Sequence, residues 1–378
     1  MSRFLKTAAA VALASLLPSL VSAAALTPGN LFVYRVGASG GGVLAGTATP
    51  VFIDEFTTAG TLVQSLAMPT TASGPNGILT GSGTATSDGY LSLAGNGQYL
   101  MLSGYDTAIG TVGNVVSNSL ARTVGRLALD GTVDTSTRLT DTGTGTNNFR
   151  SVASTNGSDL WVTTTTGGVR YTTLGSSTST QLSTSPVNTR VVGIADNQLY
   201  ISSGSGTTRL ATVGTGLPTA TGNTITNLPG FPTGTPTASS PYGFFFADLS
   251  PGVAGLDTLY VSDDGAGGGL QKYSLNGGSW VLKGVVGADA DDYRGLTGVV
   301  NGGVVSLFAT VGGNRLVSLT DSSGYDGAFA SAVTTLSTAG TNTAFRGVAM
   351  LPVPEPGTWA LMLAGLGVVA SLARRTRG

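Results

Sequence analysis

The feature that most constrains the fold is a short motif that recurs along the chain at a fixed distance. Three segments share one pattern, an aromatic residue, an arginine and three small or apolar residues: Phe149 to Ala153, Tyr293 to Thr297 and Phe345 to Ala349. Arg294 and Arg346 are 52 residues apart, and two further steps of 52 reach Tyr242 and Arg190. A repeat of this length predicts a protein built from equivalent supersecondary units.

Two further copies extend the series toward the N-terminus. Arg150 lies 40 residues before Arg190, and Tyr90 lies 60 residues before Arg150. Each copy is followed by short runs of apolar and β-branched residues, which predict second, third and fourth strands: for example Asp159 to Thr163, Val169 to Thr172 and Gln181 to Leu182 after the first arginine copy. Four strands in each unit of 40 to 60 residues are typical of a β-propeller blade.

The two ends of the repeated region complete one another. Leu31 to Arg35 matches a second strand with no first strand before it, and Phe345 to Leu351 is a first strand with no successors. We therefore predict an all-β propeller of about six four-stranded blades, in which the C-terminal strand closes the opening blade and leaves no long free edge. A β-helix and an irregular β-sandwich are the competing architectures.

Composition limits the chemistry. The chain has 58 glycines, 10% charged residues and a net charge of −1, so it offers no basic surface for nucleic acid. It contains no cysteine, so burial and backbone pairing must hold it together without disulfides. It also contains no histidine, which removes imidazole as a general base or zinc ligand. We expect no cofactor, apart from the calcium site discussed below.

The N-terminus has the order of a secretory signal peptide. Arg3 and Lys6 precede an apolar stretch from Thr7 to Leu17, and small residues follow up to Ala25. Residues 1–25 are therefore predicted to form a signal helix that is cleaved on export. The repeated region, residues 26–351, is the exported domain.

The C-terminus, residues 352–378, has three parts. Pro354, Glu355 and Pro356 form a rigid extended turn. The uncharged run from Trp359 to Ala373 follows, long enough for roughly 22 Å of helix. The run ends in three basic residues that can hold the end of the chain on the cytoplasmic side: Arg374, Arg375 and Arg377. A helix of this length is short for a bilayer core of about 30 Å, so the apolar run predicts a temporary membrane helix.

This tail resembles the PEP-CTERM sorting domain of Gram-negative bacteria, whose name-giving residues stand here as Pro354, Glu355 and Pro356. The alternative is a plain membrane tail in which these residues are only a linker. The resemblance implies recognition and cleavage by an exosortase, a membrane protease, after transient insertion in the inner membrane. It further implies delivery to the cell surface or extracellular matrix, and an association with exopolysaccharide or biofilm.

The repeated position itself is the first candidate site. It is held by four arginines and two tyrosines: Arg150, Arg190, Arg294, Arg346, Tyr90 and Tyr242. If these side chains surround one mouth of a central channel, they form a collar suited to a carboxylate, a sulfate or an acidic sugar. The alternative is structural, with each arginine pairing with an aspartate of a neighbouring blade or capping a strand.

Acidic loops are the second candidate. Asp289, Asp291 and Asp292 precede one repeat copy, and Asp263 and Asp264 follow a predicted strand. Carboxylates in a glycine-rich loop can supply oxygen ligands to calcium, although a solvated turn explains them equally. Paired carboxylates could also act in a glycan-active hydrolase or lyase, but no cluster of aromatic and basic residues surrounds them. We favour a non-catalytic exported protein that binds polysaccharide or another envelope protein, with the enzyme as the alternative.

Overall fold

The computed structural model describes residues 24–353, except 112, 118, 144 and 232–238. The predicted signal helix before residue 24 and the predicted membrane helix from Trp359 to Ala373 lie outside this part of the chain. The described residues form β-strands, with two short 3-10 helices, η1 (Val115–Ser117) and η2 (Asp289–Asp291), as the helical elements found there. Among them, no helix is long and apolar enough to span a bilayer.

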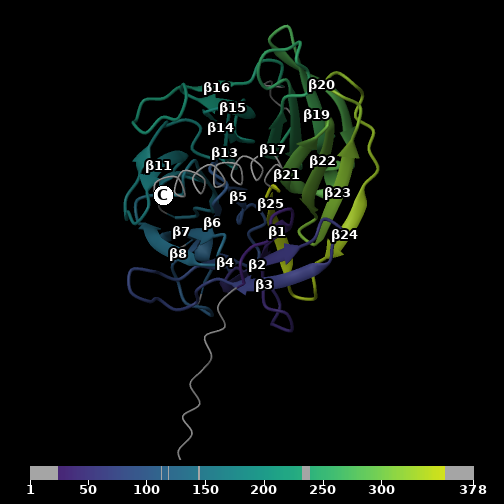
Figure 1. Ribbon diagram of the computed structural model, residues 1–378. Coiled ribbons are helices and arrows are strands. Elements are labelled where there is room, and N and C mark those ends of the chain that lie inside the picture. The colour runs from purple at the N-terminus through teal and green to yellow at the C-terminus, as the bar shows by residue number, and fades with distance from the viewer. Residues whose placement is uncertain (1–23, 112, 118, 144, 232–238, 354–378) are drawn as a thin grey trace, which may run out of the picture.

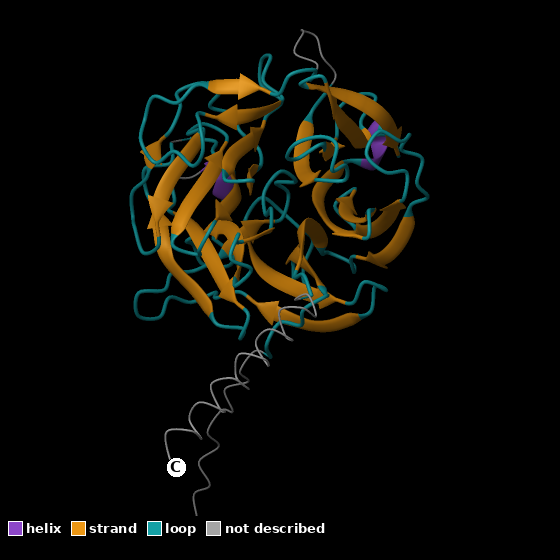
Figure 2. Ribbon diagram, turned by 45° about the horizontal axis from the view of Figure 1, so that its top comes forward, coloured by secondary structure: helices purple, strands orange, loops and turns teal. Residues whose placement is uncertain are grey.

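The strands are arranged as sheets around a central axis, as a propeller-like ring (Figures 1 and 2). Within the described residues, four sheets have four antiparallel strands each. The first two contain β9 (Phe149–Ser154), β10 (Asp159–Thr164), β11 (Val169–Thr173) and β12 (Thr180–Gln181), and then β13 (Val192–Ala195), β14 (Gln198–Ser202), β15 (Leu210–Val213) and β16 (Ile225–Asn227). The next two contain β17 (Pro241–Ala247), β18 (Thr258–Asp263), β19 (Gly269–Asn276) and β20 (Ser279–Val286), and then β21 (Tyr293–Asn301), β22 (Val304–Val311), β23 (Arg315–Asp321) and β24 (Thr334–Thr338).

The remaining strands form one nine-stranded sheet, which corrects the prediction of six separate blades. This sheet contains β1 (Leu31–Val36), β2 (Ala48–Phe56), β3 (Leu62–Ala67), β4 (Thr80–Ser82), β5 (Ser92–Leu93), β6 (Tyr99–Tyr105), β7 (Arg122–Ala128), β8 (Val133–Leu139) and β25 (Ala344–Met350). The physical reason is β4, which pairs with both β2 and β6 and so joins two groups of strands that would otherwise be separate.

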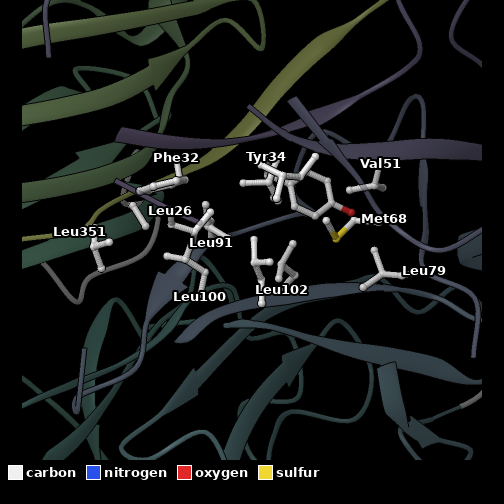
Figure 3. Close-up of a cluster of buried hydrophobic side chains, with 14 of the residues drawn as sticks. Leu26, Phe32, Tyr34, Val51, Met68, Leu79, Leu91, Leu100, Leu102 and Leu351 are labelled. Atoms are coloured by element: carbon white, nitrogen blue, oxygen red, sulfur yellow. The ribbon is translucent and has the colours of Figure 1, made fainter. Parts of the chain in front are cut away.

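The C-terminal strand closes the ring as predicted. β25 pairs antiparallel with β1, and the partners include Leu31 with Met350 and Val33 with Val348. Both ends of the domain also share one core, because Leu26 and Leu351 are buried in the same cluster as Phe32 and Leu91 (Figure 3). The N- and C-terminal segments of the described chain therefore hold each other in place.

A buried ion pair joins two neighbouring sheets of the ring, one of which packs against the closing strand β25. The Lys272 ammonium of β19 lies 2.8 Å from a carboxylate oxygen of Asp321 in β23, and both side chains are at most 3% exposed. Lys272 also donates to the Ser323 hydroxyl at 2.7 Å, and the Tyr260 hydroxyl donates to Asp321 at 2.5 Å. This network fixes the sheet of β17–β20 against that of β21–β24.

Candidate functional site

The six predicted collar residues occupy equivalent positions at one end of the inner strands. Arg150, Arg294 and Arg346 lie near the start of β9, β21 and β25, and Tyr242 lies near the start of β17. Tyr90 and Arg190 lie two residues before β5 and β13. Figure 1 places the inner strands β5, β13, β17, β21 and β25 around the centre of the ring. The repeat in the sequence thus corresponds to one level around the central axis.

Glycines bring the inner strands close together at this level. Gly243, Gly295 and Gly347 directly follow Tyr242, Arg294 and Arg346. A Cβ on Gly295 would lie 2.7 Å from the Arg346 carbonyl oxygen, and one on Gly347 would lie 2.2 Å from the Leu91 nitrogen. Any other residue would force neighbouring backbones apart, so these glycines keep the channel narrow where the collar lies.

Two tyrosines close the channel. β5 and β17 belong to strand groups on opposite sides of the ring, since two other inner strands separate them in each direction. The rings of Tyr90 and Tyr242 nevertheless stack, with centroids 6.0 Å apart and planes inclined by 15°. Both residues are buried, at 7% and 5% exposed. The stacked pair therefore forms a plug on the axis, with the arginines around it.

Arg190 and Arg294 flank this plug and share one carboxylate. The Arg190 guanidinium carbon lies 4.1 Å from the centre of the Tyr242 ring, and that of Arg294 lies 5.3 Å from it. Asp264 pairs with Arg294 at 2.9 Å and with Arg190 at 3.6 Å. The structural alternative, pairing with an aspartate of the neighbouring sheet, thus holds for these two arginines. Two cations share this single anion, and the exposed Asp292 adds a longer contact to Arg294 at 3.5 Å.

Arg150 and Arg346 are more deeply buried, and their hydrogen bonds go to uncharged groups. Arg150 donates to the Asn188 side-chain oxygen at 2.6 Å and to the Thr189 carbonyl at 2.9 Å. Arg346 donates to the Gly83 carbonyl at 3.1 Å. Each keeps a buried Nε without a partner in the described chain, and the same is true of the Tyr90 hydroxyl. Buried donors ordinarily have partners, so three such atoms at one level of the channel indicate a place for a polar group.

Burial shapes the ionisation of the collar. It lowers the pKa of Arg346 to about 10, although the nearby Asp88 and Tyr34 act in the opposite direction, so the guanidinium stays charged at neutral pH. Burial also lowers the pKa of Arg150. For Arg294 burial alone would lower the pKa, but Tyr242 and Asp264 together raise it. Burial, with Tyr242 beside it, raises the pKa of Tyr90, so its hydroxyl remains a donor at neutral pH.

A set of hydroxyls that sequence reasoning missed positions the four arginines. In each case a serine or threonine in the second strand of the preceding group donates to the arginine's carbonyl oxygen. The pairs are Ser103 with Arg150 at 3.1 Å, Thr163 with Arg190 at 2.6 Å, Ser262 with Arg294 at 2.6 Å, and Thr310 with Arg346. The sequence carries a signal for this set, because all four are serine or threonine residues near the C-terminal end of a second strand. The bond between sheets could be seen only in the fold.

Beyond the plug, the inner strands enclose a chamber. The space has a volume of about 340 Å³ and is lined by the inner strands from Tyr90 on one side to Met350 and Pro352 on the other. The collar therefore occupies one end of the channel and the chamber the other, with Tyr90 between them. We call this space the chamber below.

Two carboxylates of the acidic loop form ion pairs with different arginines. Asp291 pairs with Arg315 at 2.9 Å, and Asp292 pairs with Arg294 at 3.5 Å. The part of the chain that the structure describes contains no group of three or more acidic side chains arranged to hold a metal ion. The side chain of Asp289 lies outside the described residues, so the calcium site stays a prediction.

The sorting residues Pro354, Glu355 and Pro356 and the basic residues Arg374, Arg375 and Arg377 lie outside the described residues. Residues 352–377 match the family model of the PEP-CTERM protein-sorting motif. The chain carries a PEP-CTERM sorting motif. The motif implies export, transient membrane anchoring and processing by an exosortase. No curated protein matches the chain in sequence.

Solved structures resemble the fold at low sequence identity. A chain in the crystal structure of a nidogen/laminin complex is 14% identical, with a TM-score of 0.50, over 86% of this chain and all of that one. A periplasmic gluconolactonase of Pseudomonas aeruginosa is 14% identical, with a TM-score of 0.44, over 82% of this chain and 83% of that one. A putative 6-phosphogluconolactonase from Bacteroides uniformis is 12% identical, with a TM-score of 0.42. These similarities concern the fold alone.

Proposed function

We propose that the protein is a non-catalytic, exported binding protein that an exosortase delivers to the surface or extracellular matrix of a Gram-negative bacterium, where its collar binds an acidic group of an exopolysaccharide. The sorting motif supports the delivery. The collar supports the binding, because the Arg190 and Arg294 guanidinium groups lie against the Tyr242 ring. In addition, Arg150, Arg346 and Tyr90 each keep a buried donor without a partner in the described chain. These unused donors at the level of the Tyr90–Tyr242 pair are the single observation that carries the proposal.

The charge and shape of the collar favour a carboxylate or sulfate. Arg190 and Arg294 are the collar arginines closest to solvent, with side chains 16% and 17% exposed. They share Asp264, and only the longer contact between Asp292 and Arg294 adds a second anion, so their positive charge is partly compensated. A carboxylate of a uronic acid that enters between them would complete the pairing and reach toward the Tyr90 hydroxyl. Arginine binds such planar anions through two parallel hydrogen bonds, which adds direction as well as strength.

The test is binding of the full chain, held in amphipol, to immobilised polygalacturonate, dextran sulfate and neutral dextran. We expect binding to the first two and none to dextran. The double variant Arg190→Gln/Arg294→Gln is expected to weaken binding by more than about tenfold, because each charge-assisted hydrogen bond contributes roughly 1.5–3 kcal/mol. Arg138→Gln is the matched control, since Arg138 forms an ion pair with Asp106 and its side chain is 44% exposed.

Unchanged binding in the double variant would show that the collar does not bind the acidic polymers. A glycan-active enzyme on the same scaffold would instead release shorter sugars, so the same polymers are analysed by chromatography after incubation with the full chain. Stable polymers are expected for a binding protein.

A further inference from the structure

The chamber is lined mainly by apolar residues. On β21 the lining residues run from Leu296 to Val299, which corresponds to a depth of about 10 Å at 3.3 Å per residue. Its volume of about 340 Å³ lies in the range of ordinary small-molecule sites. Many of the lining residues are aliphatic or aromatic, including Leu93, Val152, Val192, Ile194, Phe244 and Leu296.

Serine hydroxyls in the wall bond within the protein. The Ser92 hydroxyl donates to the Val152 carbonyl at 2.6 Å, and the Ser154 hydroxyl donates to the Asp159 carbonyl at 2.6 Å. The Ser151 hydroxyl lies 2.7 Å from that of Thr163. Because these hydroxyls already have hydrogen-bond partners within the protein, they do not need polar groups of a ligand. The wall therefore suits a hydrocarbon rather than a sugar.

The mouth of the chamber lies where the sorting segment departs. Leu351 is held by two backbone hydrogen bonds, from Gly29 to its carbonyl at 2.7 Å and from its own nitrogen to the Asn30 carbonyl at 3.1 Å. Pro352, the next residue, lines the chamber and is the first residue of the sorting-motif match. Transient membrane anchoring, which the sorting motif implies, holds Pro352 and the chamber mouth near the bilayer surface, because the match begins at this residue. Lipid is therefore the partner that the mouth meets while the chain is anchored.

We propose that the chamber takes up one acyl chain of a membrane lipid, with the lipid head group at the mouth beside Pro352. The volume of about 340 Å³ and the mainly apolar wall suit a single hydrocarbon chain. The stacked tyrosines at the floor end the apolar path and separate the lipid from the collar. This site is distinct from the proposed polysaccharide site, because the two approach the Tyr90–Tyr242 plug from opposite ends of the channel.

The experiment uses the full chain in amphipol and dodecanoate that carries a diazirine at its methyl end. After illumination, the labelled residues are mapped by mass spectrometry. We expect crosslinks on the inner strands β9, β13 and β21, and competition by unlabelled dodecanoate and by uncharged dodecanol. Filling the mouth with Val299→Trp is expected to reduce these crosslinks by more than about tenfold, because the indole ring occupies apolar space in which the acyl chain would be buried.

Val300→Trp is the matched control. Val300 is the next residue along β21, is 38% exposed and does not line the chamber, so its substitution should leave the crosslinks unchanged. Crosslinks that fall only on residues 359–373 or on outer strands would overturn the proposal, as would equal labelling in Val299→Trp. The variant Arg190→Gln/Arg294→Gln should give the same crosslinks as the natural chain. Loss of polysaccharide binding and loss of acyl-chain binding can therefore be distinguished.

Discussion

Replacing Asp321 by asparagine is expected to lower the free energy of unfolding by about 3–5 kcal/mol, because the substitution leaves the ammonium of Lys272 buried without its counter-charge. Lys272 is fully buried and Asp321 is 3% exposed, so solvent cannot replace the lost partner. Denaturant unfolding followed by circular dichroism measures the change. A second variant that removes both charges, Lys272→Met/Asp321→Leu, should recover much of the stability, since no unpaired charge remains.

The same pair predicts a pH dependence with a definite sign. Burial on its own would raise the pKa of Asp321, but hydrogen bonds from Lys272, Ser323 and Tyr260 hold it below its ordinary value. Because the pKa is lower in the folded protein, this carboxylate stabilises the fold above its unfolded pKa, and the contribution is lost as the pH falls through the folded value. Asp321→Asn should therefore flatten the acid limb of the stability curve. If the acid limb is unchanged, or changes no more than in the variant Asp326→Asn at an exposed residue, the Lys272–Asp321 pair does not determine how stability depends on pH.

Ending the chain at Thr343, before β25, is expected to abolish cooperative folding. This change removes Phe345, Val348 and Leu351 from two cores and leaves β1 with a free edge next to the apolar residues of its own sheet. Exposed strand edges of this kind pair with other chains, so aggregation should accompany the loss. Thermal unfolding and size-exclusion chromatography give the measurement.

A chain ended after Pro352 is the control for this truncation. It keeps β25 and the backbone bonds between Leu351 and residues 29–30, so it should unfold cooperatively as a monomer. If the shorter chain also folds cooperatively as a monomer, β25 is dispensable and the closed ring is not what stabilises the domain.

The sequence predicted the ring and its closure because both follow from hydrophobic runs at a regular period. The missing first strand before Leu31 and the surplus strand at Phe345 left one way to complete the ring, and β25 takes it. The separation into six blades was not correct, because β4 joins two groups of strands. Its residues, Thr80–Ser82, are small and polar and give no strand signal, so their pairing depends on tertiary context.

The candidate site was predictable in position and not in detail. The period places the collar residues at one level, but their partners lie in other sheets and depend on how the sheets face one another. Asp264 was visible only as part of an acidic loop, and its contacts with Arg190 and Arg294 arise from the approach of three sheets. The stacking of Tyr90 on Tyr242 likewise requires a channel narrow enough for opposite strands to meet, which the glycines after the collar residues provide.

The last strand, β25, lies beside the first, β1, and so closes the ring that holds the collar together. The natural chain has no cysteine, so one introduced pair reports on this contact without background. Val33 and Val348 are direct partners across β1 and β25. In Val33→Cys/Val348→Cys, mild oxidation should give a disulfide within a single chain, seen by peptide mass mapping and by faster migration on a non-reducing gel. Free thiols, or disulfides only between chains, would contradict the closed ring.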